Sequence, residues 1–333
     1  MRVGRVLGVL VGALVATAIV LYLVPSGDYI LLPDVAHPVA PLVHVAGAKP
    51  AAGPGGVYFV DVFERRASEL ESLFPWLHSQ GTLEPANAIV PPCSNDAQEQ
   101  RAAIQQMALS QRIAAAVALE RLGYKVGIAR DGVLVDQVIG GTHAPCKLQS
   151  QDRILAVDGT ATPTVAKLHA AVQRVRPGQT VTLGVARGAK RLTVSVQTVA
   201  DPSAPGSALI GVVAEQAARI TLPVKVAIDS GNVGGPSAGL AFALEVMQKL
   251  GRDVDRGYKV AATGQMELDG TVAPIGGVEQ KTYGARKAGV DVFLVPAGDN
   301  ARDARRYAGG LRVIAVKTFP QALHALATLP RKG

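Results

Sequence analysis

Ser237 and Lys281 are the two residues of this sequence whose types and surroundings suit catalytic chemistry. Ser237 follows an apolar run at 224–228 and a glycine-rich turn, and it precedes a small-residue run up to Leu250 that predicts a helix. A serine at the start of a helix lies beside unpaired N–H groups and the positive end of the helix dipole, which stabilise an oxyanion. This placement fits a nucleophile. It equally fits a helix N-cap, where serine is a favoured residue.

A nucleophilic serine needs a general base, and histidine is scarce near Ser237. Of the six histidines only His324 lies in the last third of the chain, on an amphipathic segment where a packing role is favoured. Lys281 can serve instead if burial lowers its pKa from about 10.4 towards neutrality. The residues alone leave two alternatives open: Lys281 is a solvated surface lysine, or the neighbouring Glu279 pairs with it and keeps it protonated.

The elements that must position these two side chains lie in a predicted domain at 208–333. Strand-like and helical runs alternate through it, which is typical of an α/β or α+β domain. A linker, D-P-S-A-P-G-S at 201–207, is expected to precede this domain because its composition favours turns.

Residues 122–200 contain short strands and one helix and resemble a PDZ domain. The resemblance rests on L-G-Y at 122–124, G-V-L-V at 132–135 and D-R-I-L-A-V-D-G at 152–159. It implies that an extended peptide adds to a sheet edge, with backbone N–H groups holding its terminal carboxylate. The residues predicted to line this groove are Leu122, Gly123, Tyr124, Val126, Leu168 and Val172.

The last domain resembles the proteolytic domain of Lon-type serine-lysine peptidases. The motifs that carry the resemblance are G-G-P-S-A-G-L at 234–240, A-T-G-Q at 262–265, P-I-G-G-V-E-Q-K at 274–281 and G-V-D-V-F-L-V-P at 289–296. It implies that Ser237 is the nucleophile and that Lys281 is the base and later the acid. Thr263 is implied to hydrogen-bond the lysine, with Gln265 as a second supporting residue. The implied oxyanion site consists of the backbone N–H groups of Ser237, Gly235 and Gly234.

Two departures from the Lon pattern leave a second function open. Gln265 stands where many Lon enzymes carry glutamate, and Gly234 stands where many carry an acidic residue. The ATPase half of Lon is also missing, so the first hypothesis is an ATP-independent serine endopeptidase. The alternative is a catalytically idle PDZ adaptor that uses its Lon-like domain for assembly. The resemblance also implies homo-oligomers, which are commonly rings.

The first 24 residues predict a membrane anchor. Arg2 and Arg5 precede the uncharged run Val6 to Val24, whose length is close to the roughly 20 residues that span a bilayer. A cleaved signal peptide is the alternative. The arginines predict a cytoplasmic N-terminus and an extracytoplasmic remainder. In that compartment Cys93 and Cys146 could form a disulfide or remain thiols.

Between the anchor and the PDZ-like region we expect a linker at 25–55 and a strand-and-helix region at 56–121 that packs on the later domains. The whole chain of 333 residues is thus predicted to be a multidomain α+β protein. Its net charge of +8 is spread along the sequence without a basic run, so nucleic-acid binding is not expected. No metal or cofactor is predicted. The expected partners are unfolded or C-terminally exposed proteins and the membrane.

Overall fold

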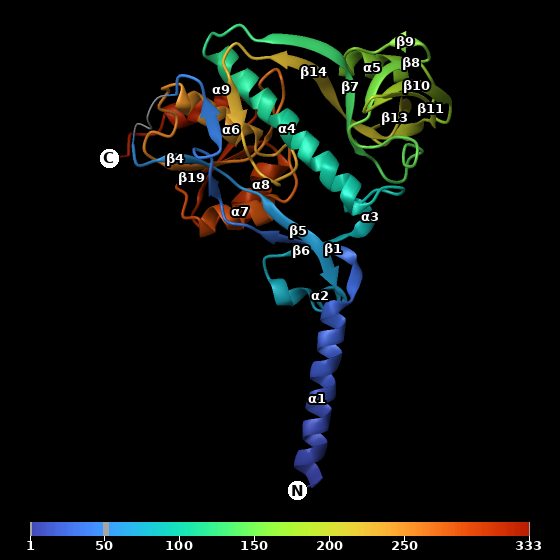
Figure 1. The fold of residues 1–333 in the computed structure, drawn as a ribbon, viewed down its shortest axis with the longest axis vertical. Coiled ribbons are helices and arrows are strands. Elements are labelled where there is room, and N and C mark those ends of the chain that lie inside the picture. Colours follow the sequence, from blue (N-terminus) through green and yellow to red (C-terminus); the bar gives the residue numbers. More distant parts are fainter. Residues whose placement is uncertain (1, 49–52, 333) are drawn as a thin grey trace.

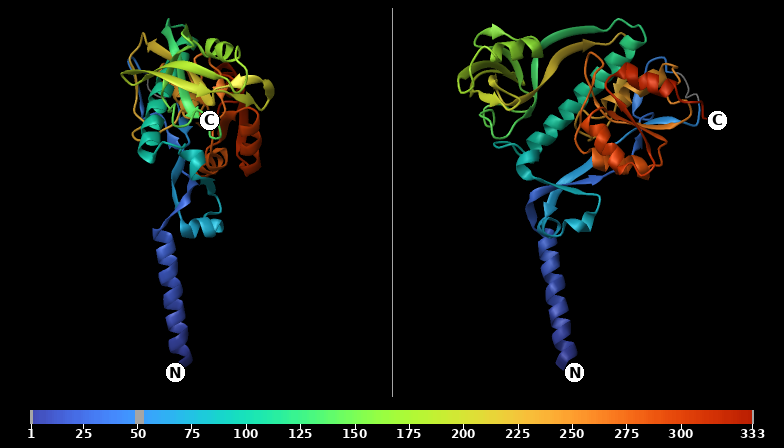
Figure 2. Two further views of the ribbon diagram at one scale, coloured as in Figure 1. Left: turned by 90° about the vertical axis from the view of Figure 1, so that its right-hand side faces the viewer. Right: turned by 180° about the vertical axis from the view of Figure 1, so that it is seen from behind.

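The computed structural model describes residues 2–48 and 53–332. A single helix stands apart at one end of the molecule, and a small sheet joins it to two larger bodies (Figure 1). One body is an α/β domain and the other is rich in β-strands. The views in Figure 2 show the same separation of the helix from the rest of the chain.

The isolated helix is α1, Arg2–Leu23. Its window Gly4–Leu23 has a mean hydropathy of 2.6, and none of that window is buried against the rest of the chain. At 1.5 Å per residue the 22 residues of α1 span about 33 Å, enough to cross the hydrocarbon core of a bilayer. Helix α1 is therefore a candidate membrane span by length and composition.

The predicted linker at 25–55 is wrong over most of its length, because it contains strands. These are β1 Pro25–Pro33, β2 His37–Pro38 and β3 Val43–Val45; residues 49–52 lie outside the described residues. The partners of β1 and β3 are distant in sequence, so proline-rich composition alone hides the pairing. Strand β3, for example, pairs antiparallel with β15, Val226–Ile228.

A three-stranded sheet in the order β5-β1-β6 follows α1 directly. Its other strands are β5 Val62–Ser68 and β6 Thr82–Pro85. Three short helices connect to it: α2 Glu69–Leu73, the 3-10 helix η1 Pro75–His78 and α3 Ala86–Ile89. Strand β5 leads from the α/β domain back towards the end of α1, so this small sheet links the two (Figure 1).

The α/β domain is built on a five-stranded sheet in the order β2-β4-β16-β19-β20. Its remaining strands are β4 Gly56–Phe59, β16 Lys259–Ala262, β19 Val292–Pro296 and β20 Arg312–Val316. Strands β4, β16, β19 and β20 run parallel to one another, and β2 is antiparallel to β4. Parallel sheets need helices on both faces to bury them.

Helices cover both faces of this sheet, and the strands alternate accordingly. Val260, Ala262 and Leu294 pack into one core, while Ala261 and Phe293 pack into another. The helices of the first face are α4 Asp96–Arg121, α6 Gly239–Lys249 and α9 Phe319–Ala327, and those of the second are α7 Val278–Lys287 and α8 Asp299–Tyr307. Strand β4 and helix α4 are integral to this domain, so residues 56–121 do pack on the later part of the chain. Two short strands, β17 Gln265–Met266 and β18 Val272–Ala273, form a separate hairpin.

The β-rich domain has the strand order β11-β10-β8-β7-β14. Its elements are β7 Gly127–Val138, β8 Arg153–Val157, β9 Thr160–Ala161, α5 Val165–Val172, β10 Thr180–Arg187, β11 Lys190–Gln197, β12 Val199–Asp201, β13 Ala204–Leu209 and β14 Val212–Thr221. The predicted linker at 201–207 is wrong, since β12 and β13 form a hairpin there. The turn-forming composition of this segment fits the hairpin turn, but composition does not predict the pairing of the segments on either side.

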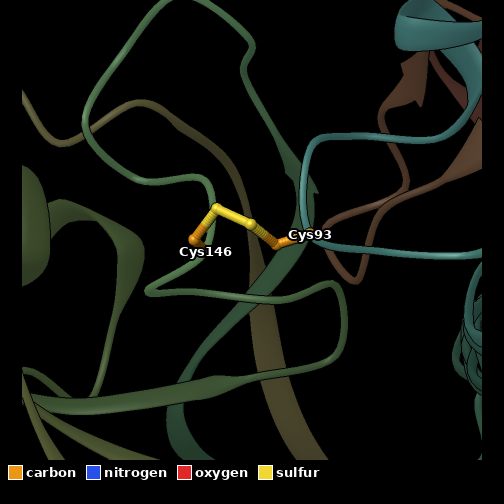
Figure 3. Close-up of a disulfide and its surroundings, with 2 residues drawn as sticks. All are labelled: Cys93 and Cys146. Atoms are coloured by element: carbon orange, nitrogen blue, oxygen red, sulfur yellow. A yellow bond between two sulfur atoms is a disulfide. The ribbon is translucent and has the colours of Figure 1, made fainter.

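The β-rich domain is an insertion in the α/β domain, and three connections hold it. Strands β7 and β14 run side by side from one body to the other: Val133 is in the β-rich core, and Ile220 is in the α/β core. A disulfide joins Cys93, before α4, to Cys146 in a loop of the β-rich domain (Figure 3). This settles the alternative between a disulfide and two thiols.

Candidate active site

Ser237 and Lys281 meet in the structure. The Lys281 Nζ donates a hydrogen bond of 2.9 Å to the Ser237 Oγ, although the residues are 44 positions apart. Ser237 lies just before α6, and Lys281 lies in the first half of α7. Lys281 is only 4% exposed, so its interpretation as a solvated surface lysine is wrong.

Ser237 is not the N-cap of α6. The cap is Ala238, and it makes no side-chain capping bond, so the Ser237 hydroxyl is left for Lys281. The Ser237 carbonyl is held by the two residues that follow β16. It accepts hydrogen bonds from the Gly264 N–H at 2.7 Å and from the Thr263 hydroxyl at 3.2 Å. Thr263 was expected to contact the lysine. It instead fixes the backbone that carries the serine.

The predicted oxyanion site needs one correction. The Gly235 N–H donates to the Ala103 carbonyl of α4 at 2.8 Å, so Gly235 is not available to an oxyanion. Among the described residues, the N–H groups of Ser237 and Gly234 have no recorded acceptor. A Cβ at position 234 would lie 2.7 Å from the Ala103 Cβ. Close packing against α4 therefore explains why glycine, rather than an acidic residue, occupies position 234.

Helix α4 is a support that the sequence did not point to. The Ser110 hydroxyl donates to the Pro236 carbonyl at 2.9 Å, next to the Gly235–Ala103 bond. Two consecutive residues before Ser237 are thus tied to one helix. The helical pattern of residues 97–122 predicts this helix, and region 56–121 is expected to pack on the later domains, but neither prediction points to the turn before Ser237.

Burial controls the charge of Lys281. Desolvation lowers the pKa of this amine to about 8, and the Asp61 carboxylate opposes the shift by favouring the ammonium form. Glu279, the other carboxylate considered, faces Tyr307 instead, where it raises the pKa of that phenol. At neutral pH roughly a tenth of the lysine is therefore neutral and able to accept a proton.

The dyad opens into a cleft of about 950 Å³. Residues from all three parts of the chain beyond α1 line it, among them Tyr29 and Arg66 of the small sheet, Asp136 of β7 and Gln265 of the β17 hairpin. Gln265 also hydrogen-bonds Glu215, whose pKa is raised to about 8, mainly by burial. Gln265 thus belongs to the cleft wall beside the dyad.

His324 plays no part in this cleft. It lies on α9 and lines a different hollow with Arg121 and Arg252. A triad of serine, histidine and aspartate is therefore excluded for this histidine by its position.

The structure does not bring all the residues predicted to line a peptide groove together. Residues 122–124 form the end of α4: Gly123 has φ of +88°, and the Tyr124 N–H bonds back to the Leu119 carbonyl at 3.0 Å. Leu122 and Val126 pack on the α/β core rather than on the groove. The motif L-G-Y was a helix C-cap, for which a glycine in this conformation is typical.

A groove of about 110 Å³ lies instead between α5 and the edge strand β14. Leu168 and Val172 line it as predicted, but the facing strand begins at the turn Ile210-Gly211, where Gly211 has φ of +79°. Ile139 also lines this groove. The strand that would receive a peptide thus follows the rest of the domain in sequence, which is why the boundary at residue 200 omitted it.

Comparison with known proteins identifies the same two kinds of domain but draws the boundary differently, because β14 falls within the Lon match. Residues 212–327 match the family model of the Lon protease C-terminal proteolytic domain, and residues 120–198 match that of the PDZ domain. Lon protease 2 of Bacillus subtilis is 33% identical over 112 residues, which cover 34% of this chain and 19% of that protein. Lon protease of Helicobacter pylori is 38% identical over 93 residues, covering 27% of this chain and 11% of that protein.

The chain thus spans less than a fifth of the length of these relatives. A solved PDZ domain of an SdrC-like protein from Listeria monocytogenes is 25% identical and covers 26% of this chain and 90% of that one, at a TM-score of 0.24. The fold and the family models define the class: a multidomain α+β chain with a Lon-type serine peptidase domain. The region that matches the PDZ domain, 120–198, precedes the Lon match in the sequence.

Proposed function

We propose that this chain is an ATP-independent serine endopeptidase that uses Ser237 and Lys281 as a catalytic dyad. The observation that carries the proposal is the 2.9 Å hydrogen bond between a buried lysine and the serine, inside a cleft of the Lon-type domain. A nucleophile within hydrogen-bond reach of a base of lowered pKa is the arrangement that covalent catalysis requires.

The chemistry follows from the geometry. Neutral Lys281 takes the hydroxyl proton as the Ser237 Oγ attacks the substrate carbonyl, and the backbone N–H groups of Ser237 and Gly234 stabilise the resulting oxyanion. The lysine ammonium then gives that proton to the leaving amine, which departs and leaves an acyl-serine. Water attacks the acyl group while Lys281 accepts its proton, and return of the proton to Ser237 Oγ releases the carboxylic acid product.

We further propose that α1 anchors the enzyme in the cell membrane with its N-terminus in the cytoplasm and the rest outside. The length and apolarity of α1 support the membrane span, Arg2 and Arg5 before it favour a cytoplasmic N-terminus, and the Cys93–Cys146 disulfide fits an oxidising compartment outside. The substrates would then be unfolded envelope or secreted proteins. A cleft can accept an unfolded chain one segment at a time, whereas a folded substrate domain would have to fit as a whole.

The decisive experiment is hydrolysis of an unfolded, dye-labelled protein by the full chain in liposomes, with and without ATP. Ser237→Ala is expected to reduce the rate to background, while Ser203→Ala, an exposed serine of the β12–β13 turn, retains it. Full activity of Ser237→Ala would overturn the dyad. A requirement for ATP would overturn ATP independence. If no variant cleaves but peptide binding persists, the adaptor alternative is favoured.

We propose that the PDZ groove between α5 and β14 recruits substrates by their apolar C-termini. Ile139→Asp places a carboxylate where the peptide carboxylate and apolar side chain would lie. It is expected to weaken binding of a peptide ending in valine about tenfold, or roughly 1.4 kcal/mol. Tyr124→Ala, at the site the sequence indicated, is expected to bind normally. Calorimetric titration measures both, and the reverse result would restore the sequence-based groove.

A further inference from the structure

An apolar segment lies exposed beside α1. Residues 73–77, L-F-P-W-L, run from the last residue of α2 through most of η1, and we call them the LFPWL segment. Leu73 is 59% exposed, Trp76 73% and Leu77 44%, and Phe74 and Pro75 are also exposed. Five consecutive exposed apolar residues are uncommon on a water-facing surface and indicate a partner.

The segment lies at the level where α1 ends. The Glu69 N–H, at the start of α2, donates to the Val24 carbonyl at 2.9 Å, one residue beyond α1. Figure 1 and the left view of Figure 2 show α2 and its neighbour beside the upper end of α1, on the side of the small sheet that faces the helix. If α1 spans a bilayer, its end lies in the headgroup region, and so does whatever is bonded to Val24.

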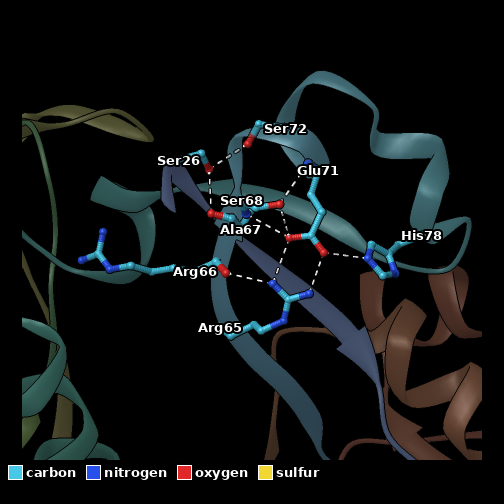
Figure 4. A network of polar contacts seen from close by, with 8 residues as sticks. All are labelled: Ser26, Arg65, Arg66, Ala67, Ser68, Glu71, Ser72 and His78. Atoms are coloured by element: carbon cyan, nitrogen blue, oxygen red, sulfur yellow. Dashed lines mark hydrogen bonds and ion pairs between the residues drawn. The ribbon is translucent and has the colours of Figure 1, made fainter. Parts of the chain in front are cut away.

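The conformation of the segment is fixed in advance. Glu71 and His78 bracket it, and the Glu71 Oε1 and His78 Nε2 are 2.7 Å apart, which closes the loop (Figure 4). Arg65 of β5 donates two bonds to Glu71, at 2.6 and 2.9 Å, and Ser68 completes a capping box with it. The hydroxyl of the neighbouring Ser72 lies within hydrogen-bond distance of two acceptors on β1, the Ser26 hydroxyl at 2.8 Å and the Asp28 carboxylate at 2.9 Å. A segment held in this way loses little conformational freedom when it binds.

We propose that the LFPWL segment inserts into the headgroup and upper acyl region of the same bilayer that α1 crosses. This inference rests on the proposed anchoring of α1. Tryptophan at a membrane interface keeps its ring in the apolar layer and its N–H near water, and phenylalanine and leucine add buried apolar area. A lipid surface is favoured over a protein partner, because the bond to Val24 brings the segment to the bilayer whenever α1 is inserted.

Two contacts with one bilayer fix the orientation of the enzyme. A lone helix tilts and rotates freely, whereas α1 and the LFPWL segment together define a plane. The Arg65 that braces the segment also lines the cleft, and β5 spans 7 residues, or roughly 20 Å. The segment therefore holds the cleft at a set height and direction above the membrane.

Trp76 makes the proposal directly testable, because it is the only tryptophan in the chain. The full chain is placed in phosphatidylcholine and phosphatidylglycerol liposomes, with or without lipids brominated near the headgroup end of the acyl chains. We expect tryptophan emission at shorter wavelength than in the urea-unfolded chain and strong quenching by the brominated lipids. The matched control moves the tryptophan to the opposite end of the molecule, as Trp76→Phe with Tyr124→Trp. In that variant brominated lipids are expected not to quench.

The outcomes separate this inference from the anchoring. Liposome flotation first shows whether the chain is membrane-bound, and a chain that does not float overturns both proposals. A chain that floats, with Trp76 open to acrylamide and unaffected by bromine, overturns the insertion alone. A blue shift that grows with protein density and is insensitive to bromine would assign the segment to a second copy, and this also overturns the proposal.

Discussion

Lys281 and Glu71 are two almost fully buried ionisable side chains that the fold treats in opposite ways. Lys281 is 4% exposed and Glu71 1%. Glu71 meets the Arg65 guanidinium, His78 and Ser68, and these bonds hold the pKa of its carboxyl well below the usual range. Lys281 bonds to the neutral hydroxyl of Ser237, and burial lowers its pKa to about 8. Neither side chain is exposed, but Glu71 lies nearer the surface, beside an Arg65 that is 33% exposed, so the partners and the depth of burial together decide whether the group keeps its charge.

This difference in pKa suggests a structural role for the charged Glu71 and a chemical role for Lys281, which can lose its proton. The pKa of Glu71 is lower in the folded chain, so its stabilisation is present above the unfolded value of about 4.3 and is lost as the pH falls below it. The pKa of Lys281 is also lowered, but for an amine this means that the charged form is disfavoured. Its folded pKa of about 8 lies below the unfolded value, so burial costs stability at neutral pH, and that cost is relieved as the pH rises from 8 towards 10.4.

The largest expected effect comes from removing the lysine amine. Lys281→Met keeps the length and burial of the side chain, and we expect kcat/KM for an unfolded protein to fall about 10²- to 10⁴-fold, the usual contribution of a general base. Stability in urea should be unchanged or higher, because an uncompensated buried amine is gone. Lys287→Met, exposed on the same helix, is the control. A variant that loses stability along with activity would contradict the comparison.

Removing the Glu71 carboxylate should have the reverse effect: a loss of stability with little direct effect on the catalytic dyad. Glu71→Gln leaves Arg65 without its counter-charge, and we expect the small sheet to lose about 2–3 kcal/mol. This is less than the roughly 3–5 kcal/mol of enclosed pairs, because Arg65 is 33% exposed. Urea unfolding followed by Trp76 emission reports this region. Glu69→Gln, on the same helix but outside the network, should change the free energy of unfolding little. An equal loss in that variant would mean that the bonds of Glu71 to Arg65 and His78 do not account for the effect.

The smallest expected effect tests how a neighbouring carboxylate changes the pKa of Lys281. Asp61 raises the pKa of this lysine, and it lies near Asp34 and His37. Activity should rise with pH through about 8 as the lysine loses its proton. Asp61→Asn should move that midpoint to lower pH, by less than about one unit. Glu279→Gln, on α7 but facing Tyr307, should leave it in place. A shift to higher pH in Asp61→Asn would contradict the assigned cause.

Local patterns revealed much of this protein. Alternating strands and helices gave the α/β domain, and continuous apolarity gave α1. Patterns failed where strands pair with distant partners, as in β1 and β3, because pairing leaves no trace in local composition. They also failed at Gly123, since a positive φ serves a helix C-cap and a PDZ loop alike.

The sequence by itself determined which residues could do chemistry here: a serine after a glycine-rich turn, and a lysine 44 positions later. Tertiary structure decided whether they do. Only the packing of α4, α6 and α7 buries the amine, turns Glu279 away and occupies the Gly235 N–H. A pKa depends on the water and charges around a group, and those come from segments far apart in the chain.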